Sequence, residues 1–264
     1  MAIIVLTSAS GSPGVTATAL GLTLTWPRPA VLVEADPTGG SGLLAGYFHG
    51  EAAHSGGLID LAVAHREGNL AQSLWSQMVP IPGTNALLLP GVRSHAQARS
   101  LTTLWGPLTS ALRGLERNGQ DVIVDAGRLG LEGAPGPLMM GADLALLTMR
   151  TTLPALSGAR SWAESLREEF EKIGSLPRLG TLLIGEGQPY GAREVRKVLG
   201  LPVVESVPWD TAGASVFSTG ANRPRKFDNS GLVRGLRATG AAIQAAIESN
   251  RADLEVTKNV GSPA

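Results

Sequence analysis

The chain has 264 residues, 43% of them hydrophobic and 17% charged, which is enough for one large buried core or at most two small ones. Its 22 basic and 22 acidic residues balance, so no global charge draws it to nucleic acid or anionic lipid, and such a partner must meet a local patch. No cysteine occurs, which excludes disulfides and thiolate metal sites, and the four histidines show no ligand spacing such as HxxxH.

The beginning of the chain carries no sign of a targeting segment. The apolar start, Ala2 to Leu6, is too short for the apolar core of a signal peptide and has no basic residue before it. No stretch reaches the roughly 20 apolar residues of a membrane span. We therefore expect a soluble, cytoplasmic protein.

The first half of the chain alternates predicted strands with predicted helices. Its elements, in order, are a strand over 2–7, a loop of small residues over 8–14, a helix over 15–26, a strand over 30–33, a glycine-rich segment over 37–42, helices over 58–64 and 70–78, a strand over 86–89 and a long helix over 96–118, with a weak point at Gly106-Pro107. The first strand, helix and second strand predict a βαβ unit with a right-handed crossover.

The second half continues the alternation. Its elements are strands over 121–125 and 144–148, a helix over 153–173, a strand over 181–185, a short helix over 194–199, an edge strand over 203–207 and an alanine-rich amphipathic helix over 233–247. Residues 251–264 are polar enough to predict a disordered tail. We expect one α/β domain over residues 1–250, with a mostly parallel central sheet and helices on both faces.

The loop between the first strand and the first helix has the composition of a phosphate-binding loop. Backbone N–H groups and a helix N-terminus attract anions at such a position. On the template GxxxxGK[ST], Gly11 and Thr18 match, Thr16 takes the place of the second glycine and Ala17 that of the lysine. The candidate nucleotide-binding residues are Gly11, Ser12, Pro13, Gly14, Val15, Thr16, Ala17 and Thr18. A plain βα turn, built from small residues, is the alternative.

The missing lysine is the most informative feature of this loop. A lysine there meets the β- and γ-phosphates and the charge that develops during phosphoryl transfer. The first lysine of the chain is Lys172, so no neighbouring lysine replaces it, and only arginines such as Arg28, Arg128 or Arg150 remain as sources of charge. Backbone donors and the Thr18 hydroxyl remain, but we expect stabilisation of the transition state to fall steeply.

Two further strand ends carry carboxylates. The segment Glu34-Ala-Asp36 ends the second strand, and Asp36 is either a residue that orients water or the centre of an Asx turn or helix cap. The strand that begins at Asp121 ends at Asp125, the pattern that holds Mg²⁺ in phosphate-binding proteins. In an open parallel sheet, ligands bind beyond the carboxyl ends of the strands, so these loops are expected to form one site.

With these motifs in this order, the chain resembles the MinD/ParA family of deviant-Walker ATPases over residues 1 to about 248. Further similarity lies in Leu199-Gly-Leu-Pro202 and in Val207-Pro208-Trp-Asp210 near the end of the domain. The resemblance implies a P-loop NTPase-like three-layer sandwich. It also implies that Asp36 positions the attacking water, that Thr18 and Asp125 hold Mg²⁺, and that the loop binds ATP or ADP.

The departures from the family pattern are equally specific. Ser12 and Ala17 stand where the family has two lysines, and Gly185-Glu186-Gly187 stands where it often has an asparagine that reads adenine. We therefore expect a degenerate nucleotide site and no efficient ATPase activity, and leave open whether ATP or ADP with Mg²⁺ binds or no nucleotide does. Residues 251–264 have no apolar stripe, which argues against the membrane helix of MinD-type members.

The resemblance implies a nucleotide-binding or pseudo-ATPase switch that partitions, positions or assembles a cellular cargo. A homodimer and a protein partner, either ParB-like or from a secretion or assembly system, follow from it. Nonspecific DNA binding would fall to the basic cluster of Arg223, Arg225 and Lys226 with Arg234 and Arg237, whose alternative is a solvated face. The alternative function is a Rossmann-type dinucleotide-binding oxidoreductase, although GxGxxG is not satisfied and neither tyrosine, Tyr47 or Tyr190, has a lysine four residues later.

Overall fold

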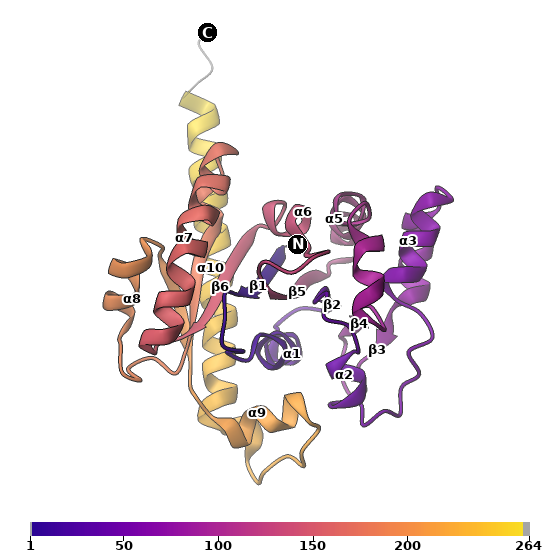
Figure 1. Ribbon diagram of the computed structural model, residues 1–264, viewed down its shortest axis with the longest axis horizontal. Coiled ribbons are helices and arrows are strands. Elements are labelled where there is room, and N and C mark those ends of the chain that lie inside the picture. Colours follow the sequence, from indigo (N-terminus) through magenta and orange to yellow (C-terminus); the bar gives the residue numbers. More distant parts are fainter. Residues whose placement is uncertain (1, 261–264) are drawn as a thin grey trace.

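An eight-stranded sheet runs through the centre of the molecule (Figure 1), and the computed structural model describes residues 2–260. The strand order is β3-β4-β2-β5-β1-β6-β7-β8, and only the β3–β4 pair is antiparallel. The strands are β1 (Ile3–Ser8), β2 (Ala30–Glu34), β3 (Val79–Pro80), β4 (Leu87–Leu89), β5 (Asp121–Arg128), β6 (Leu144–Arg150), β7 (Leu179–Ile184) and β8 (Val203–Val207). The mostly parallel sheet is confirmed.

The connection from β1 through α1 to β2 leaves room for one strand between β1 and β2. β1 and β2 are parallel, but β5 lies between them and pairs with both. In the Rossmann order the first two strands are neighbours. The strand order thus differs from that of a dinucleotide-binding fold, and it brings the ends of β2, β5 and β1 together in that sequence across the sheet.

Side-chain alternation in the strands divides the core into two layers. Ile3 and Val5 of β1 face one layer, and Ile4 and Leu6 face the other. The first layer is covered by α3 (Leu58–Arg66), α4 (Leu70–Ser73), α5 (Trp105–Arg113), α6 (Gly136–Met140), α7 (Leu153–Lys172) and α8 (Ala192–Leu199). The second is covered by α1 (Val15–Thr25), α2 (Gly42–Ala45), α9 (Thr211–Ser218) and α10 (Gly231–Val260). The three-layer sandwich is confirmed.

The long helix expected over 96–118 is divided into three pieces. A 3₁₀ segment (His95–Leu101) precedes α5, and a second one (Gly114–Asn118) follows it. Pro107 is the third residue of α5, where a missing N–H costs nothing because the first four amides of a helix have no internal acceptor. A new helix therefore begins two residues before the proline. Trp105, its first residue, is buried and donates its indole N–H to the Gly133 carbonyl (2.9 Å).

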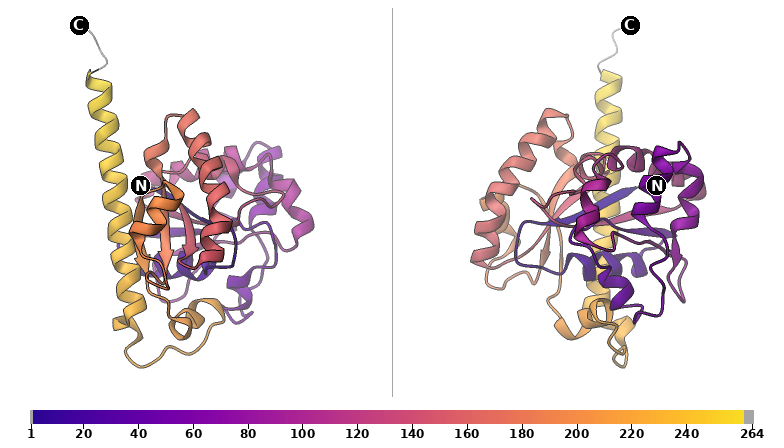
Figure 2. Two further views of the ribbon diagram at one scale, coloured as in Figure 1. Left: turned by 60° about the vertical axis from the view of Figure 1, so that its left-hand side comes forward. Right: turned by 45° about the vertical axis from the view of Figure 1, so that its right-hand side comes forward.

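The last helix is longer than the sequence pattern predicts. α10 continues through the expected tail as far as Val260, and Figure 2 shows it running along the outside of the body and past it. Near the expected end, Asn250 donates to the Pro177 carbonyl (2.8 Å) and Arg251 pairs with Asp143 (3.1 Å). These ties extend the helix beyond its apolar stripe, and positions 261–264 of the expected tail lie outside the described residues. No helix within the described part of the chain is long and apolar enough to cross a membrane.

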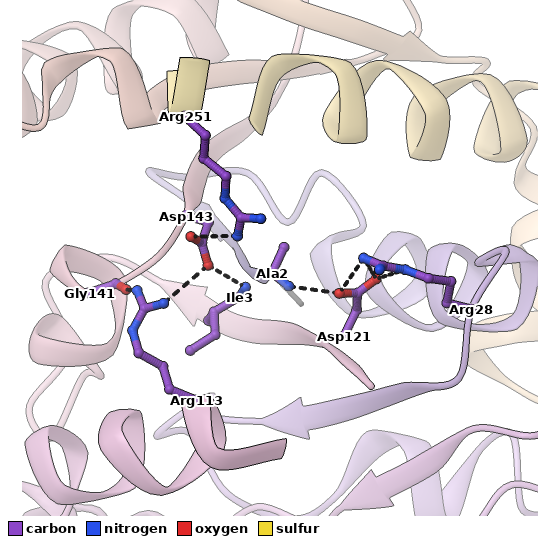
Figure 3. A network of polar contacts seen from close by, with 8 residues as sticks. All are labelled: Ala2, Ile3, Arg28, Arg113, Asp121, Gly141, Asp143 and Arg251. Atoms are coloured by element: carbon purple, nitrogen blue, oxygen red, sulfur yellow. Dashed lines mark hydrogen bonds and ion pairs between the residues drawn. The ribbon is translucent and has the colours of Figure 1, made fainter. Parts of the chain in front are cut away.

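Two carboxylates hold the amino-terminal ends of the central strands in place (Figure 3). Asp121 accepts hydrogen bonds from the Ala2 amide (2.7 Å), the Trp26 indole (2.7 Å) and the Arg28 guanidinium (2.9 Å). Asp143 accepts from the Ile3 amide (2.8 Å) and pairs with Arg113 and Arg251. These bonds fix the start of β1 to the start of β5 and to the residue before β6. They lie at the amino-terminal ends of the strands, whereas the candidate site lies at the carboxyl ends.

Candidate functional site

The carboxyl ends of β1, β2 and β5 converge on one place, as the sequence predicts. Glu34 of β2 lies opposite Asp125 of β5 in the strand register, and Leu6 of β1 lies opposite Asp125 on the other side. The Ala35 amide continues the pairing by donating to the Asp125 carbonyl (2.8 Å). Thr16 in the first turn of α1, the Asp36 loop and Asp125 border a common space, whereas Ser12, Pro13 and Gly14 of the loop after β1 line a neighbouring cavity.

The loop after β1 has the backbone of an anion-binding turn. Gly11, Ser12 and Gly14 all have positive φ angles, of 76°, 44° and 97°. Gly14 is the left-handed N-cap of α1, and its carbonyl receives the first helical hydrogen bond from the Thr18 amide (2.9 Å). A left-handed serine such as Ser12 is uncommon and strained, which marks the loop as specialised. The free amides of the first turn of α1 point out of this end of the helix.

The first turn of α1 separates two cavities. On one side lies what we call the carboxylate cavity, about 150 Å³, which is lined by Thr16, Glu34, Asp36, Thr38, Gly39, Gly40, Ser41, Gly42, Gly91, Val92 and Asp125. On the other side lies the apolar cavity, about 260 Å³, whose walls include Ala17, Thr18, Ile184, Val207, Trp209, Phe217 and Leu236.

This division places Thr16, and not Thr18, beside Asp125. Residues two apart on an α-helix point about 200° from each other, so only one of the two threonines can face the carboxylate. The Thr16 side chain interacts with the Asp125 carboxylate, whereas Thr18 is buried against the apolar cavity. The Mg²⁺-side pair expected from the sequence, Thr18 with Asp125, is therefore not brought together. The signal for Thr16 was local, because it is the second residue after a glycine that caps a helix.

Asp125 is a buried carboxylate with unsatisfied bonding capacity. It is 1% exposed, its Oδ1 accepts the Gly127 amide (3.0 Å), and its Oδ2 has no hydrogen-bond partner among the described residues. The pKa of Asp125 is raised to about 7, chiefly by burial and also by the nearby Asp36 and Glu34 carboxylates, while hydrogen bonds from the Thr16 side chain and the Gly127 amide oppose the shift. The folded protein thus resists ionisation of this group.

The other two carboxylates of the cavity each use one oxygen on the backbone. Asp36 Oδ1 accepts the Thr38 amide (2.8 Å), the Asx turn that the sequence left open as an alternative. Glu34 Oε2 accepts the Gly91 amide (3.1 Å). The Asp36 side chain lies directly against Gly127, where any Cβ atom would collide with the carboxyl group. Both carboxylates are thus held in place at the cavity wall.

None of the described residues that line the carboxylate cavity is a cation. The three arginines that the sequence offered as sources of charge lie elsewhere. Arg28 binds Asp121 at the amino-terminal ends of the strands. The Arg150 guanidinium stacks 3.5 Å from the centre of the Trp209 ring, and Arg128 is exposed at the end of β5. The three carboxylates, Glu34, Asp36 and Asp125, are therefore not neutralised by a side chain of the cavity wall.

The raised pKa of Asp125 predicts that stability depends on pH. The carboxyl group holds its proton more tightly in the folded chain (about 7) than in the unfolded chain (3.8), so its contribution to stability is complete below about pH 4 and is lost as pH rises through 7. Between pH 5 and pH 8 we expect this group to lower the free energy of unfolding by on the order of 2 kcal/mol. Urea denaturation at the two pH values measures it.

Asp125→Asn should remove this part of the pH dependence and raise stability at pH 8. Asp60→Asn, a change at an exposed residue of α3, is the matched control and should keep the wild-type profile. An Asp125→Asn profile as steep as the wild-type one would show that another group causes the dependence.

The basic cluster near the end of the domain is partly committed to local structure. Arg234 donates to the Asn229 carbonyl (3.0 Å) and Arg237 to the Asp228 carbonyl (3.0 Å). Arg223, Arg225 and Lys226 are exposed in the loop before these residues. Two of the five cations therefore brace the turn before α10, and the other three form the exposed part of the cluster.

No protein-family model and no curated protein matches the chain. Solved structures do. It is similar to the cell division ATPase MinD of Pyrococcus furiosus, with TM-score 0.70, 19% identity, and 92% of this chain and 98% of that chain covered. The chain has the MinD/ParA fold. MinD of Pyrococcus horikoshii with Mg-ADP (TM-score 0.67, 17% identity, 90% and 94% covered) and a ParA family ATPase of Chlorobium tepidum (0.67, 17%, 91% and 98%) show the same likeness.

A nucleotide with Mg²⁺, such as the Mg-ADP of the Pyrococcus horikoshii MinD structure, does not fit the carboxylate cavity of this chain. Thr16 and Asp125 are suited to the metal side of such a site. No described residue that lines this cavity has a positive side chain, and its wall carries three carboxylates. Within residues 2–260, moreover, no three histidine or carboxylate side chains come together in a way that could hold a metal ion. The Rossmann alternative is not favoured either, since both the strand order and the structural neighbours differ from it.

Proposed function

We propose that this protein is a pseudo-ATPase of the MinD/ParA fold that positions or assembles a cellular cargo by binding a protein partner, without turning over ATP. The observation that carries the proposal is the carboxylate cavity, which retains Thr16 and Asp125 but has no cation to face a phosphate. In phosphoryl transfer nearly all catalysis comes from positioning and from positive charge on the transferred group. Without that charge, hydrolysis is not supported.

The geometry of α1 supports a new alignment of the loop with the P-loop template. Gly14 caps the helix, Val15 is its first residue and Thr16 faces Asp125, an order that corresponds to Gly, Lys and Ser/Thr at the end of GxxxxGK[ST]. In this alignment Val15, 7% exposed, replaces the lysine that the first alignment placed at Ala17. Both alignments lack a lysine, so the expectation of weak catalysis is the same in each.

The role of Asp36 also changes in this proposal. Its Asx turn and its contact with Gly127 make it a support of the loop that begins at Pro37, rather than a residue that orients an attacking water. The partner remains of the class that the family resemblance implies, either ParB-like or a secretion or assembly component. A homodimer remains part of the proposal, and the exposed Arg223, Arg225 and Lys226 are its candidate contact with DNA.

The test is calorimetric titration with ATP and with ADP, each with and without Mg²⁺, together with an assay of phosphate release. We expect no Mg²⁺-dependent binding at about millimolar nucleotide and no turnover above the buffer rate, because the loop offers only neutral donors to a charged phosphate chain. Asp125→Ala should give the same result as the wild type.

The opposite result has a clear signature. Binding that requires Mg²⁺, weakens in Asp125→Ala and is accompanied by phosphate release would replace the pseudo-ATPase with a slow nucleotide-driven switch. Binding without release would leave a nucleotide-dependent switch that does not hydrolyse. Either outcome would contradict the proposal as stated.

A further inference from the structure

The carboxylate cavity is built to receive positive charge. We propose that it binds the guanidinium group of an arginine presented by a protein partner. The proposal rests on the proposed function only in that the arginine comes from a partner. It adds the chemistry by which that partner would be recognised.

The first support is the charge balance of the walls. Glu34, Asp36 and Asp125 line the cavity, and its other lining residues are threonines, a serine, glycines and a valine. Carboxylates that share a small space disfavour one another and favour an opposite charge brought within about 4–6 Å. An anion such as phosphate would meet the same walls with the wrong sign.

The second support is independent of the charge count. Asp125 Oδ2 is buried, borders the cavity and accepts no hydrogen bond from any residue that the structure describes. A buried acceptor left unsatisfied costs free energy, which a donor placed in the cavity would recover. The Asx turn and the Gly91 contact occupy one oxygen each of Asp36 and Glu34, which holds these groups at the wall.

The size and polarity of the space favour a guanidinium group over a metal ion. The cavity measures about 150 Å³. No three carboxylate or histidine side chains of the described chain converge closely enough to coordinate a metal. A guanidinium is planar and carries five N–H donors in a fixed arrangement, so it can bond several acceptors at once, including the Thr16 hydroxyl, without requiring them to converge on a point.

The cavity is reachable from solvent. Thr38, Gly40 and Gly42 line it and are exposed; the first two belong to the loop between β2 and α2, and Gly42 is the first residue of α2. This rim has little side-chain bulk because two of its three residues are glycines. A long side chain of a partner could therefore enter between the Asp36 loop and the start of α1.

The test uses N-acetyl-L-arginine amide as the probe and N-acetyl-L-citrulline amide as its uncharged isostere, followed by ¹H–¹⁵N NMR of the full chain. We expect the arginine probe to shift the amides of Thr16, Thr38 and Gly127 saturably, with a dissociation constant of about millimolar order, and the citrulline probe to bind at least about tenfold more weakly. Asp125→Asn and, separately, Glu34→Gln should each weaken the arginine probe severalfold, while Asp60→Asn should leave it unchanged.

Equal binding of the citrulline probe, or unchanged binding in both cavity variants, would overturn the proposal. So would shifts of the same amides by MgCl₂ with none by the arginine probe. Two variants are used because each is judged only if its spectrum remains that of the folded chain. Failure of the arginine probe together with absence of ATP binding would refute the arginine site alone and leave the pseudo-ATPase standing.

Discussion

Replacing Asp121 by alanine is expected to lower the free energy of unfolding by about 3 to 5 kcal/mol, a large part of the stability of a typical domain. The carboxylate is fully buried and accepts hydrogen bonds from the Ala2 amide, the Trp26 indole and Arg28. Its removal leaves the first two donors buried without an acceptor, each at a cost of about 1–3 kcal/mol. Urea denaturation at constant pH measures the loss.

Asp143→Ala is the matched control for this prediction. Asp143 performs a similar task for the Ile3 amide, but its side chain is 11% exposed and its arginine partners are largely at the surface. Solvent can replace part of what is lost there, so we expect a smaller effect than at Asp121. A loss at Asp143 equal to or greater than that at Asp121 would contradict the role assigned to burial.

Val15→Lys is expected to restore nucleotide binding and to lower the dissociation constant for ADP with Mg²⁺ by at least about 100-fold relative to the wild type. The lysine would stand at the first position of α1, between Gly14 and Thr16, and would add the missing positive charge at the N-terminus of a helix, a position that favours anions. Calorimetry measures the gain, and a thermal melt shows that the buried substitution is tolerated.

Ala17→Lys distinguishes the two alignments of the loop. Ala17 borders the apolar cavity, on the side of α1 away from Asp125, so a lysine there should give little gain in affinity. Tighter binding by Ala17→Lys than by Val15→Lys would restore the first alignment, with Thr18 as the metal-side residue. No gain in either variant would show that the loop lacks more than a charge.

Much of the fold could be predicted from local pattern, because the periodicity of apolar residues reports burial directly. The strands over 30–33, 144–148 and 203–207 lie within or at β2, β6 and β8, and β8 is the edge strand that was expected. The helix over 96–118 was expected to have a weak point at Gly106-Pro107, and the structure places the break just before it, where α5 restarts the hydrogen bonding at Trp105 although the apolar spacing persists across Pro107. Periodicity does not register such a break.

The candidate site was predicted in part for a similar reason. Glu34, Asp36 and Asp125 were found because a carboxylate at the end of an apolar strand is visible in the sequence. The choice between Thr16 and Thr18 was missed, because the template was aligned on Gly11 and not on Gly14, the glycine that caps α1 with a left-handed backbone. A template aligned on Gly11 placed its Ser/Thr position two residues too late, although the helix itself was expected to begin at residue 15, where α1 does begin.

By itself the sequence determined the alternation of strands and helices, the carboxylates at the strand ends and the absence of lysine before Lys172, because each is a property of neighbouring residues. Only the tertiary structure decided that β5 separates β1 from β2, that Thr16 faces Asp125, and that Arg28 and Arg150 lie away from the carboxylate cavity. These depend on contacts between residues far apart in the chain, such as Ala2 with Asp121 and Ile3 with Asp143, and such contacts are selected by the packing of the whole core rather than by local preference.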